Sequence, residues 1–221
     1  MKNQSITEAM LQFIEESPTA FHAAANVEAL LLENGFEKLE NLAEGALVPG
    51  GSYYTMQNGS AVLAVKIPEN PAKGFRIAAS HSDSPCFKIK EVPEMKVENT
   101  YVKLNVEKYG GMILSPWLDR PLSVAGRVFV AGKDGKPEAK LVNLKKDLLI
   151  IPNVAIHFNR EINNGFAYNP QTDMAPLMGL DQELSIKKLC AEAADVAEEE
   201  ILGSDLYVYN QDKGRIMGAD D

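Results

Sequence analysis

The sequence predicts a mixed α/β protein, and three features of the chain indicate this class. Two helical patterns open the chain, one after Ser5 and one over residues 20–34. Two strand-like segments then flank Asn58-Gly59, a pair that is typical of a tight β-hairpin. From about Pro93 onward, short apolar segments separated by turn residues predict a β-rich module.

The first two helices carry recognisable start and stop signals. Ser5 opens the run S-I-T-E, a capping box in which the Ser5 hydroxyl and the Glu8 carboxylate each accept from the other residue's backbone N–H. For the second helix we expect Ser17 as the N-cap and Pro18 as the first helical residue, where its missing N–H costs nothing. Gly35 is expected to end that helix.

Several strands are expected. Residues 52–57 and 60–67 should pair as a hairpin, because Asn-Gly tolerates the positive φ angles of a type I′ turn. Residues 75–80 (F-R-I-A-A-S) form a short apolar run directly before His81, which predicts a strand buried on both faces. In the β-rich module we expect strands at 101–108, 126–131, 148–151 and 205–210, and one amphipathic helix over 185–202.

Composition excludes several classes of protein. The chain has 221 residues and a formal net charge of −9. Such an acidic chain lacks the cationic surface that nucleic acids and anionic membranes require, so neither is expected as a partner. The two cysteines, Cys86 and Cys190, are too far apart for a zinc knuckle and too few for a disulfide framework. With no signal-peptide pattern at the start, we expect a cytoplasmic protein.

The sharpest local motif is A-S-H-S-D-S-P, residues 79–85. Residues two apart on a strand share a face, so His81 and Asp83 can approach one another. A carboxylate that accepts from one imidazole nitrogen fixes the tautomer and leaves the other nitrogen able to bind a metal. From the residues alone, a surface histidine beside a turn is the other interpretation, and the same holds for a structural His157 in N-V-A-I-H-F-N-R. His22, inside the second helix, is interpreted as structural.

Four segments together carry a resemblance that runs nearly end to end. They are F-I-E-E-S-P-T-A-F-H-A (13–23), A-S-H-S-D-S-P-C-F-K-I-K (79–90), Y-G-G-M-I-L-S-P-W-L-D-R-P-L-S-V-A-G-R-V (109–128) and I-P-N-V-A-I-H-F-N-R-E-I-N (151–163). In order and spacing they resemble the aspartyl aminopeptidase family of metallopeptidases, family M18.

The resemblance implies a zinc-exopeptidase-type α/β domain with an inserted β-rich dimerisation domain. Residues 1–92 would be the first part of the catalytic domain, 93–213 the insertion, and 214–221 the start of the return. His81 matches a zinc ligand, Asp83 the acid that orients it, and His157 a histidine that contacts substrate in a neighbouring subunit. The family acts on peptides as a homo-oligomer, a dimer or dodecamer, with two zinc ions in each site.

The resemblance also implies that most of the catalytic site is absent from this chain. The bridging aspartate, the adjacent Glu-Glu pair and the final histidine of the family all follow the insertion. We therefore expect a zinc-dependent aminopeptidase that removes N-terminal residues, acidic ones among the candidates, but no activity from the 221-residue chain alone. The alternative is that the chain is a non-catalytic oligomerisation module. In either case the half-domain is expected to expose apolar surface.

Overall fold

The computed structural model describes residues 5–40, 47–70 and 74–219, and has mixed α/β architecture. The chain divides into two compact units, Met1–Ser84 with Gly214–Asp221 (unit 1) and Pro85–Lys213 (unit 2). The boundary expected after residue 92 falls inside a continuous strand, β4 (Cys86–Val97). Among the described residues, every helix is too short or too polar to cross a bilayer.

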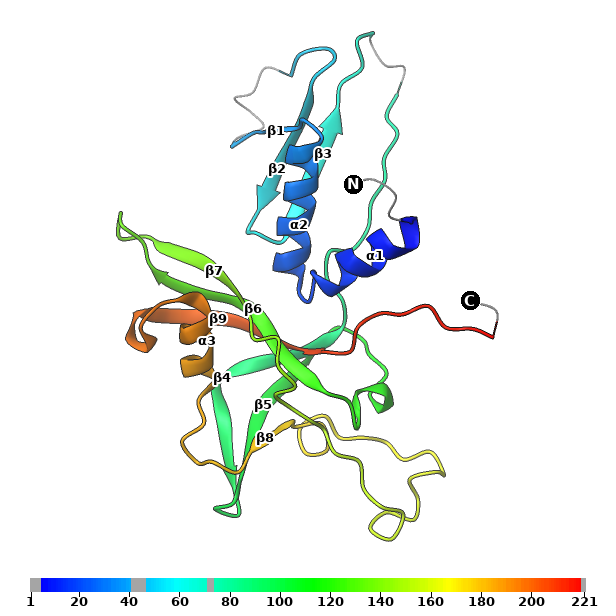
Figure 1. The fold of residues 1–221 in the computed structure, drawn as a ribbon, viewed down its shortest axis with the longest axis vertical. Helices are drawn as coiled ribbons and strands as arrows, with labels where there is room; N and C mark the ends of the chain where they lie inside the picture. Colours follow the sequence, from blue (N-terminus) through cyan, green and yellow to red (C-terminus); the bar gives the residue numbers. More distant parts are fainter. Residues whose placement is uncertain (1–4, 41–46, 71–73, 220–221) are drawn as a thin grey trace. The chain divides into compact units, whose positions relative to one another are not determined.

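Unit 1 combines two helices with a small sheet (Figure 1). The helices are α1 (Ile6–Glu15) and α2 (Ala20–Glu33), and the strands are β1 (Glu37–Lys38), β2 (Ser52–Gln57) and β3 (Ala61–Lys66). The sheet order is β1-β2-β3, with β1 parallel and β3 antiparallel to β2. The buried Tyr54 of β2 donates from its hydroxyl to Glu28 of α2 at 2.9 Å, which ties the helix to the sheet.

The start signals of unit 1 are confirmed in part. The capping box is present, since Glu8 N donates to Ser5 Oγ at 3.2 Å and Ser5 N donates to the Glu8 carboxylate at 2.9 Å. The expected hairpin is also present, with Asn58 at φ 53° and Gly59 at φ 68°. The expected cap at Ser17, with Pro18 as the first helical residue, is wrong, because α2 begins after Thr19. Thr19 has an extended backbone, and its Oγ1 accepts from the N–H of His22 at 3.5 Å.

The strand expected over residues 75–80 is absent from the described structure. The segment has no regular secondary structure, and Phe75 and Ile77 are 92% and 86% exposed. An apolar segment becomes a buried strand only when neighbouring strands supply its hydrogen bonds, and the described sheet of unit 1 ends at β3. The expectation of exposed apolar surface in this unit is confirmed.

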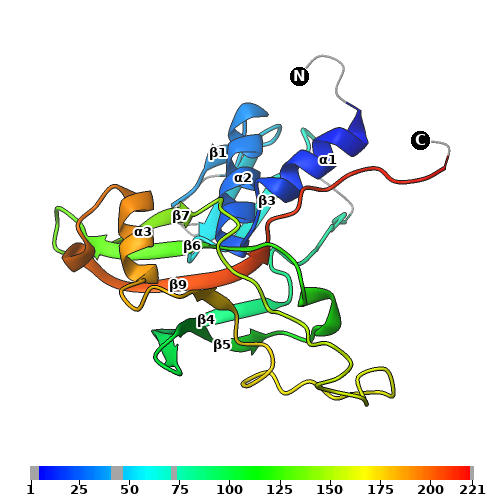
Figure 2. The same ribbon diagram turned by 60° about the horizontal axis from the view of Figure 1, so that its bottom comes forward.

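Unit 2 is built on a six-stranded antiparallel sheet with the order β7-β6-β9-β4-β5-β8. Besides β4, its strands are β5 (Tyr101–Tyr109), β6 (Leu122–Ala131), β7 (Pro137–Asn143), β8 (Leu177–Gly179) and β9 (Ile201–Asn210). Two short 3₁₀ helices, η1 (Ser115–Trp117) and η2 (Glu198–Glu200), join them. Helix α3 (Ile186–Ala194) lies across one face of the sheet and buries Ile186 and Cys190 there (Figure 2).

Two expectations for unit 2 are wrong, for local reasons. The helix expected over 185–202 ends at Ala194, because Asp195 adopts a left-handed conformation and Val196 N donates back to Ala191 O at 3.1 Å. The strand expected over 148–151 makes only single bridges, from Leu149 to Leu122 and from Ile150 to Leu177. Its apolar side chains are core residues nonetheless, with Leu149 3% exposed and Ile151 fully buried.

Candidate functional site

The predicted pair His81 and Asp83 is in contact. His81 Nδ1 lies 3.1 Å from Asp83 Oδ1, and the two side chains are 91% and 36% exposed. An imidazole that carries its proton on Nδ1 donates to this carboxylate, and its Nε2 then carries the lone pair that binds a metal. The pair therefore holds the imidazole in one orientation on a side chain that is open to solvent.

The pair is held against the hairpin of unit 1 by the residue between its members. Ser82 Oγ donates to the backbone oxygen of Ser60 at 2.8 Å, and Ser60 lies directly before β3. Residues 74–84 have no strand pairing in the described structure, and this bond ties the motif to the hairpin. Sequence reasoning missed Ser82, since its partner is 22 residues away and the contact has no sequence signature.

The described residues supply fewer donors than a catalytic zinc needs. A catalytic zinc requires about three protein ligands and an open position for water. Within the described ranges 5–40, 47–70 and 74–219, no group of three or more His, Cys, Asp or Glu side chains could hold a metal ion. His81 fits the role of one ligand and Asp83 that of its orienting acid, but the described residues do not form a complete site.

His157 lies in the other unit, on a long loop over residues 152–173 that we call the His157 loop. The histidine is exposed, within the turn that Phe158 N closes by donating to Ala155 O at 2.9 Å. Asp119 fixes the start of the loop, because its carboxylate accepts from Asn153 N at 2.8 Å and its backbone N donates to Ile151 O at 3.0 Å. The sequence indicates a loop-holding role for Asp119 through an ion pair with Arg120, but the partner of its carboxylate here is a backbone N–H, and its positive φ of 57° marks a special turn.

The third histidine serves the local structure, as expected. His22 Nδ1 lies 2.8 Å from the hydroxyl of Thr19, the N-cap of α2. The three histidines thus occupy three separate environments in the described structure: a helix start, the motif with Asp83, and the His157 loop. Among them, His81 lies against the Asp83 carboxylate, which is placed to orient its ring.

The sequence is closely related to proteins of known classification. A family profile described as "Aminopeptidase I zinc metalloprotease (M18)" matches residues 13–221. The "Probable M18 family aminopeptidase 2" of Clostridium acetobutylicum is 44% identical, over 99% of this chain and 52% of the relative. The protein of the same name from Clostridium novyi is 43% identical, over 100% of this chain and 53% of the relative. The chain therefore spans about half the length of the curated relatives it matches.

Solved structures agree with this relationship. The structure titled "Cryo-EM structure of the Ape4 and Nbr1 complex" superposes with a TM-score of 0.88 at 31% identity, covering 96% of this chain and 45% of that one. The structure of mApe1 from Chaetomium thermophilum superposes with a TM-score of 0.86 at 29% identity, covering 97% and 52%. Since the profile match extends over nearly the whole sequence, this chain belongs to the M18 family of aminopeptidases.

Proposed function

We propose that this chain is part of a zinc-dependent aminopeptidase in which His81 is one zinc ligand and Asp83 orients its ring. The observation that carries the proposal is the 3.1 Å contact between His81 Nδ1 and Asp83 Oδ1. The family profile, whose description includes zinc, supports the identity of the metal. Zinc in such enzymes lowers the pKa of a bound water and polarises the scissile carbonyl.

The residues of this chain would contribute orientation. Asp83 holds the proton on Nδ1 of the imidazole. The neutral ring is therefore kept in the tautomer whose Nε2 lone pair can bind the metal. Ser82 keeps the pair at the end of the hairpin through its bond to Ser60. Because one ligand cannot hold a catalytic zinc, we propose that the other ligands are additional to the described residues and that the 221-residue chain alone is inactive.

We further propose that unit 1 belongs to a catalytic α/β domain and unit 2 to an inserted dimerisation domain, with the boundary expected after residue 92 moved to Ser84, because β4 continues through residue 92. The separate core of unit 2, which spans β4 to β9 and α3, supports the second assignment. In a homo-oligomer of dimers, up to a dodecamer, the His157 loop would reach the active site of a neighbouring subunit, where His157 contacts the substrate. The exposure of Phe158, which is 84% exposed beside His157, supports such a buried destination.

The proposed substrates are peptides, cleaved after their N-terminal residue, with acidic residues as the preferred class. The names of the relatives support aminopeptidase activity. The test uses the natural gene product that carries this sequence, assayed on aminoacyl-coumarin substrates before and after dialysis against a chelator. We expect hydrolysis to be lost on chelation and restored by zinc, whereas the 221-residue chain should be inactive under both conditions.

Site variants locate the metal. His81→Ala should lower the zinc content of the purified gene product and abolish hydrolysis, because it removes a ligand. Asp83→Asn should weaken zinc binding by about 10–100-fold, because it removes the orienting charge. His22→Ala is the matched control and should keep its zinc. Activity that survives chelation, or full zinc content in His81→Ala, would refute the proposal.

A further inference from the structure

The His157 loop is an exposed segment that is nevertheless held at both ends. Ile151 before it and Met174 after it are fully buried. At the far end, Asp173 N donates to Asn169 O at 2.9 Å and Asn169 N donates to the Asp173 carboxylate at 2.8 Å. The ribbon shows the loop standing away from the sheet of unit 2 (Figure 1). A loop anchored in this way can present side chains to a partner at a small cost in conformational entropy.

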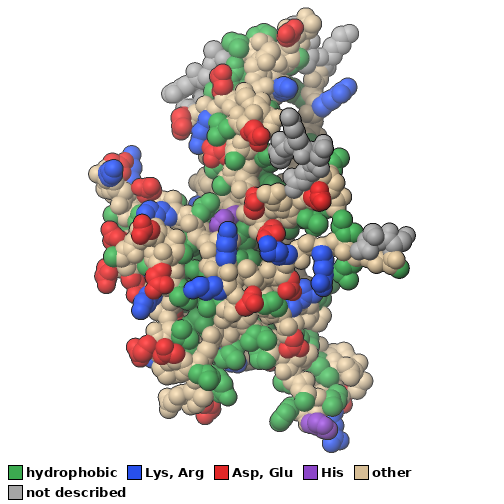
Figure 3. Space-filling view, in the orientation of Figure 1, with side chains coloured by type: hydrophobic (Ala, Val, Ile, Leu, Met, Phe, Trp, Pro, Cys, Tyr) green, Lys and Arg blue, Asp and Glu red, His purple; other side chains and the backbone are tan. Residues whose placement is uncertain are grey.

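The exposed side chains around His157 are of the kind found at the centre of interfaces. Phe158, Val154 and Ile156 are 84%, 50% and 45% exposed. Arg160, three residues after His157, is exposed as well, and it is the only lysine or arginine within residues 152–173 of the sequence. The space-filling view shows histidine and basic surface together at the end of this loop (Figure 3). The combination of aromatic, histidine and arginine side chains matches the composition of binding hot spots.

The carboxylates of the His157 loop have hydrogen-bond partners within the loop, whereas its arginine is in no ion pair of the described chain. The carboxylate of Glu161 accepts from Asn164 Nδ2 at 3.1 Å, and that of Asp173 accepts from the Asn169 backbone and the Thr172 hydroxyl. None of the ion pairs found among residues 5–40, 47–70 and 74–219 includes Arg160. Its guanidinium is therefore an exposed cation without a carboxylate partner in the described chain, in a protein of net charge −9.

We propose that Arg160 is a specificity-determining residue that binds the side-chain carboxylate of an acidic N-terminal substrate residue in a neighbouring subunit's active site. This inference rests on the proposed function, in which the His157 loop reaches that site. A guanidinium presents a planar fork of N–H donors that matches a carboxylate with two parallel hydrogen bonds. With a neutral substrate residue, the cation would be desolvated without a partner. Binding of neutral substrates is therefore expected to be weaker.

The experiment compares acidic and neutral substrates on the natural gene product that carries this sequence. The substrates are the aspartyl, glutamyl and leucyl derivatives of 7-amino-4-methylcoumarin. For Arg160→Ala we expect kcat/KM on the two acidic substrates to fall about 10–100-fold, because a charge-assisted hydrogen bond is lost. The change should be mainly in KM, and kcat/KM on the leucyl substrate should be unchanged or higher.

Two variants complete the design. Arg160→Lys keeps the charge but loses the planar fork, so its preference should lie between those of the wild type and Arg160→Ala. Arg120→Ala removes another exposed arginine of unit 2 and should leave the preference unchanged. Thermal unfolding followed by circular dichroism checks that each variant is folded, which we expect because Arg160 is exposed.

The outcomes separate this inference from the proposed function. Equal losses on acidic and neutral substrates, an unchanged ratio in Arg160→Ala, or a wild-type enzyme without preference for acidic residues would overturn the role of Arg160. In each of these cases, zinc-dependent hydrolysis of the leucyl substrate would leave the proposed function standing. A gene product that hydrolyses none of the three substrates would overturn both.

Discussion

The two units of this chain use their apolar residues in opposite ways. In unit 2, strands from β4 to β9 and helix α3 surround one core in which Phe87, Leu104 and Val208 are completely buried. In unit 1, the described buried apolar residues are confined to α2 and β2, while Leu63, Phe75 and Ile77 are 58%, 92% and 86% exposed. An apolar pattern thus yields a closed core only where the elements it must pack against are present.

The largest loss of unfolding free energy is expected for a substitution in the core of unit 2. Phe87→Ala should lower the free energy of unfolding by about 3–5 kcal/mol, because it removes a buried aromatic ring and leaves a cavity. The ring lies 5.1 Å from that of Trp117, centroid to centroid, in an edge-to-face arrangement. Trp117 is the single tryptophan of the chain, so its fluorescence during urea denaturation reports on unit 2.

The matched substitution lies in unit 1. Leu63→Ala also shortens an apolar side chain within a strand, but this side chain is 58% exposed. We expect its effect on the free energy of unfolding, followed by circular dichroism, to stay within about 0.5 kcal/mol. Similar losses for the two variants would mean that unit 1 closes a core around Leu63 in solution, and the contrast between the units would fail.

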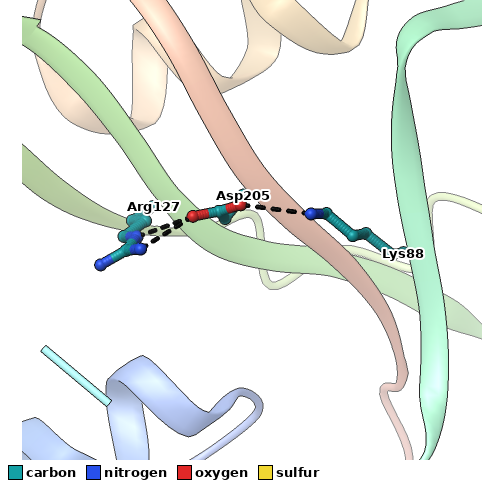
Figure 4. A network of polar contacts seen from close by, with 3 residues as sticks. All are labelled: Lys88, Arg127 and Asp205. Carbon is teal, nitrogen blue, oxygen red and sulfur yellow. Dashed lines mark hydrogen bonds and ion pairs between the residues drawn. The ribbon is translucent and has the colours of Figure 1, made fainter. Parts of the chain in front are cut away.

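The second effect concerns the polar side of the sheet in unit 2. Asp205 of β9 accepts from Arg127 Nε at 3.0 Å and Nη2 at 2.9 Å, and lies 3.4 Å from Lys88 Nζ (Figure 4). These side chains are 18–35% exposed, so solvent screens them only in part. Asp205→Ala should cost about 1–3 kcal/mol, because it leaves two partly buried cations without their carboxylate.

A charge-neutral control sharpens that test. Asp205→Asn keeps the shape and one acceptor oxygen, so its loss of unfolding free energy should be smaller than that of Asp205→Ala. Urea denaturation at low and high salt measures both variants. The Arg127→Ala and Asp205→Ala changes should be non-additive when combined, since they break the same pair. Simple additivity would show that the ion pair does not stabilise the sheet.

The alkaline limit of stability should also be set by unit 2. Burial raises the pKa of Tyr207 from 10.0 to about 12, with smaller contributions from the nearby Asp205, Cys86 and Tyr109. A raised folded-state pKa stabilises the fold fully below pH 10, and this contribution is lost as the pH rises from 10 to about 12. We expect a loss of about 1–2 kcal/mol for this partly exposed group, after allowing for screening by solvent.

The variant Tyr207→Phe isolates this contribution. It lacks the ionisable hydroxyl and should lose less unfolding free energy than the wild type over the same alkaline range. Tyr209, whose pKa is also raised by burial, stays in place in both proteins, so the difference between them belongs to Tyr207. Parallel stability curves for the two proteins would contradict the assignment.

Local signals in the sequence predicted those parts of the fold that depend on near neighbours. The capping box of α1 and the Asn58-Gly59 turn involve residues within a few positions of each other, and both are present. Strand β4 was missed because Pro93 lies inside it. Proline usually ends a strand, but here the ladder with β5 is irregular between Ile89 and Glu94, where a proline is tolerated.

The candidate site divides in the same way. The approach of His81 to Asp83 follows from a two-residue spacing and could be predicted. The anchors of the site could not, because Ser82 reaches Ser60 and Asp119 reaches Asn153 through contacts that only the folded chain creates. The prediction of a buried strand over residues 75–80 was wrong because a strand also needs a partner. The apolar pattern is clear, but no strand among the described residues pairs with this segment.

The smallest expected effect tests the open side of unit 1 directly. Replacing Phe75 and Ile77 by serine should change the free energy of unfolding by no more than about 0.5 kcal/mol, because both side chains are already solvated. The same double variant should bind less of the dye ANS, which reports exposed apolar surface. A loss above about 1 kcal/mol would show that these residues are packed in solution, by a second copy or by unit 1 itself. The difference in apolar exposure between the two units would then not hold in solution.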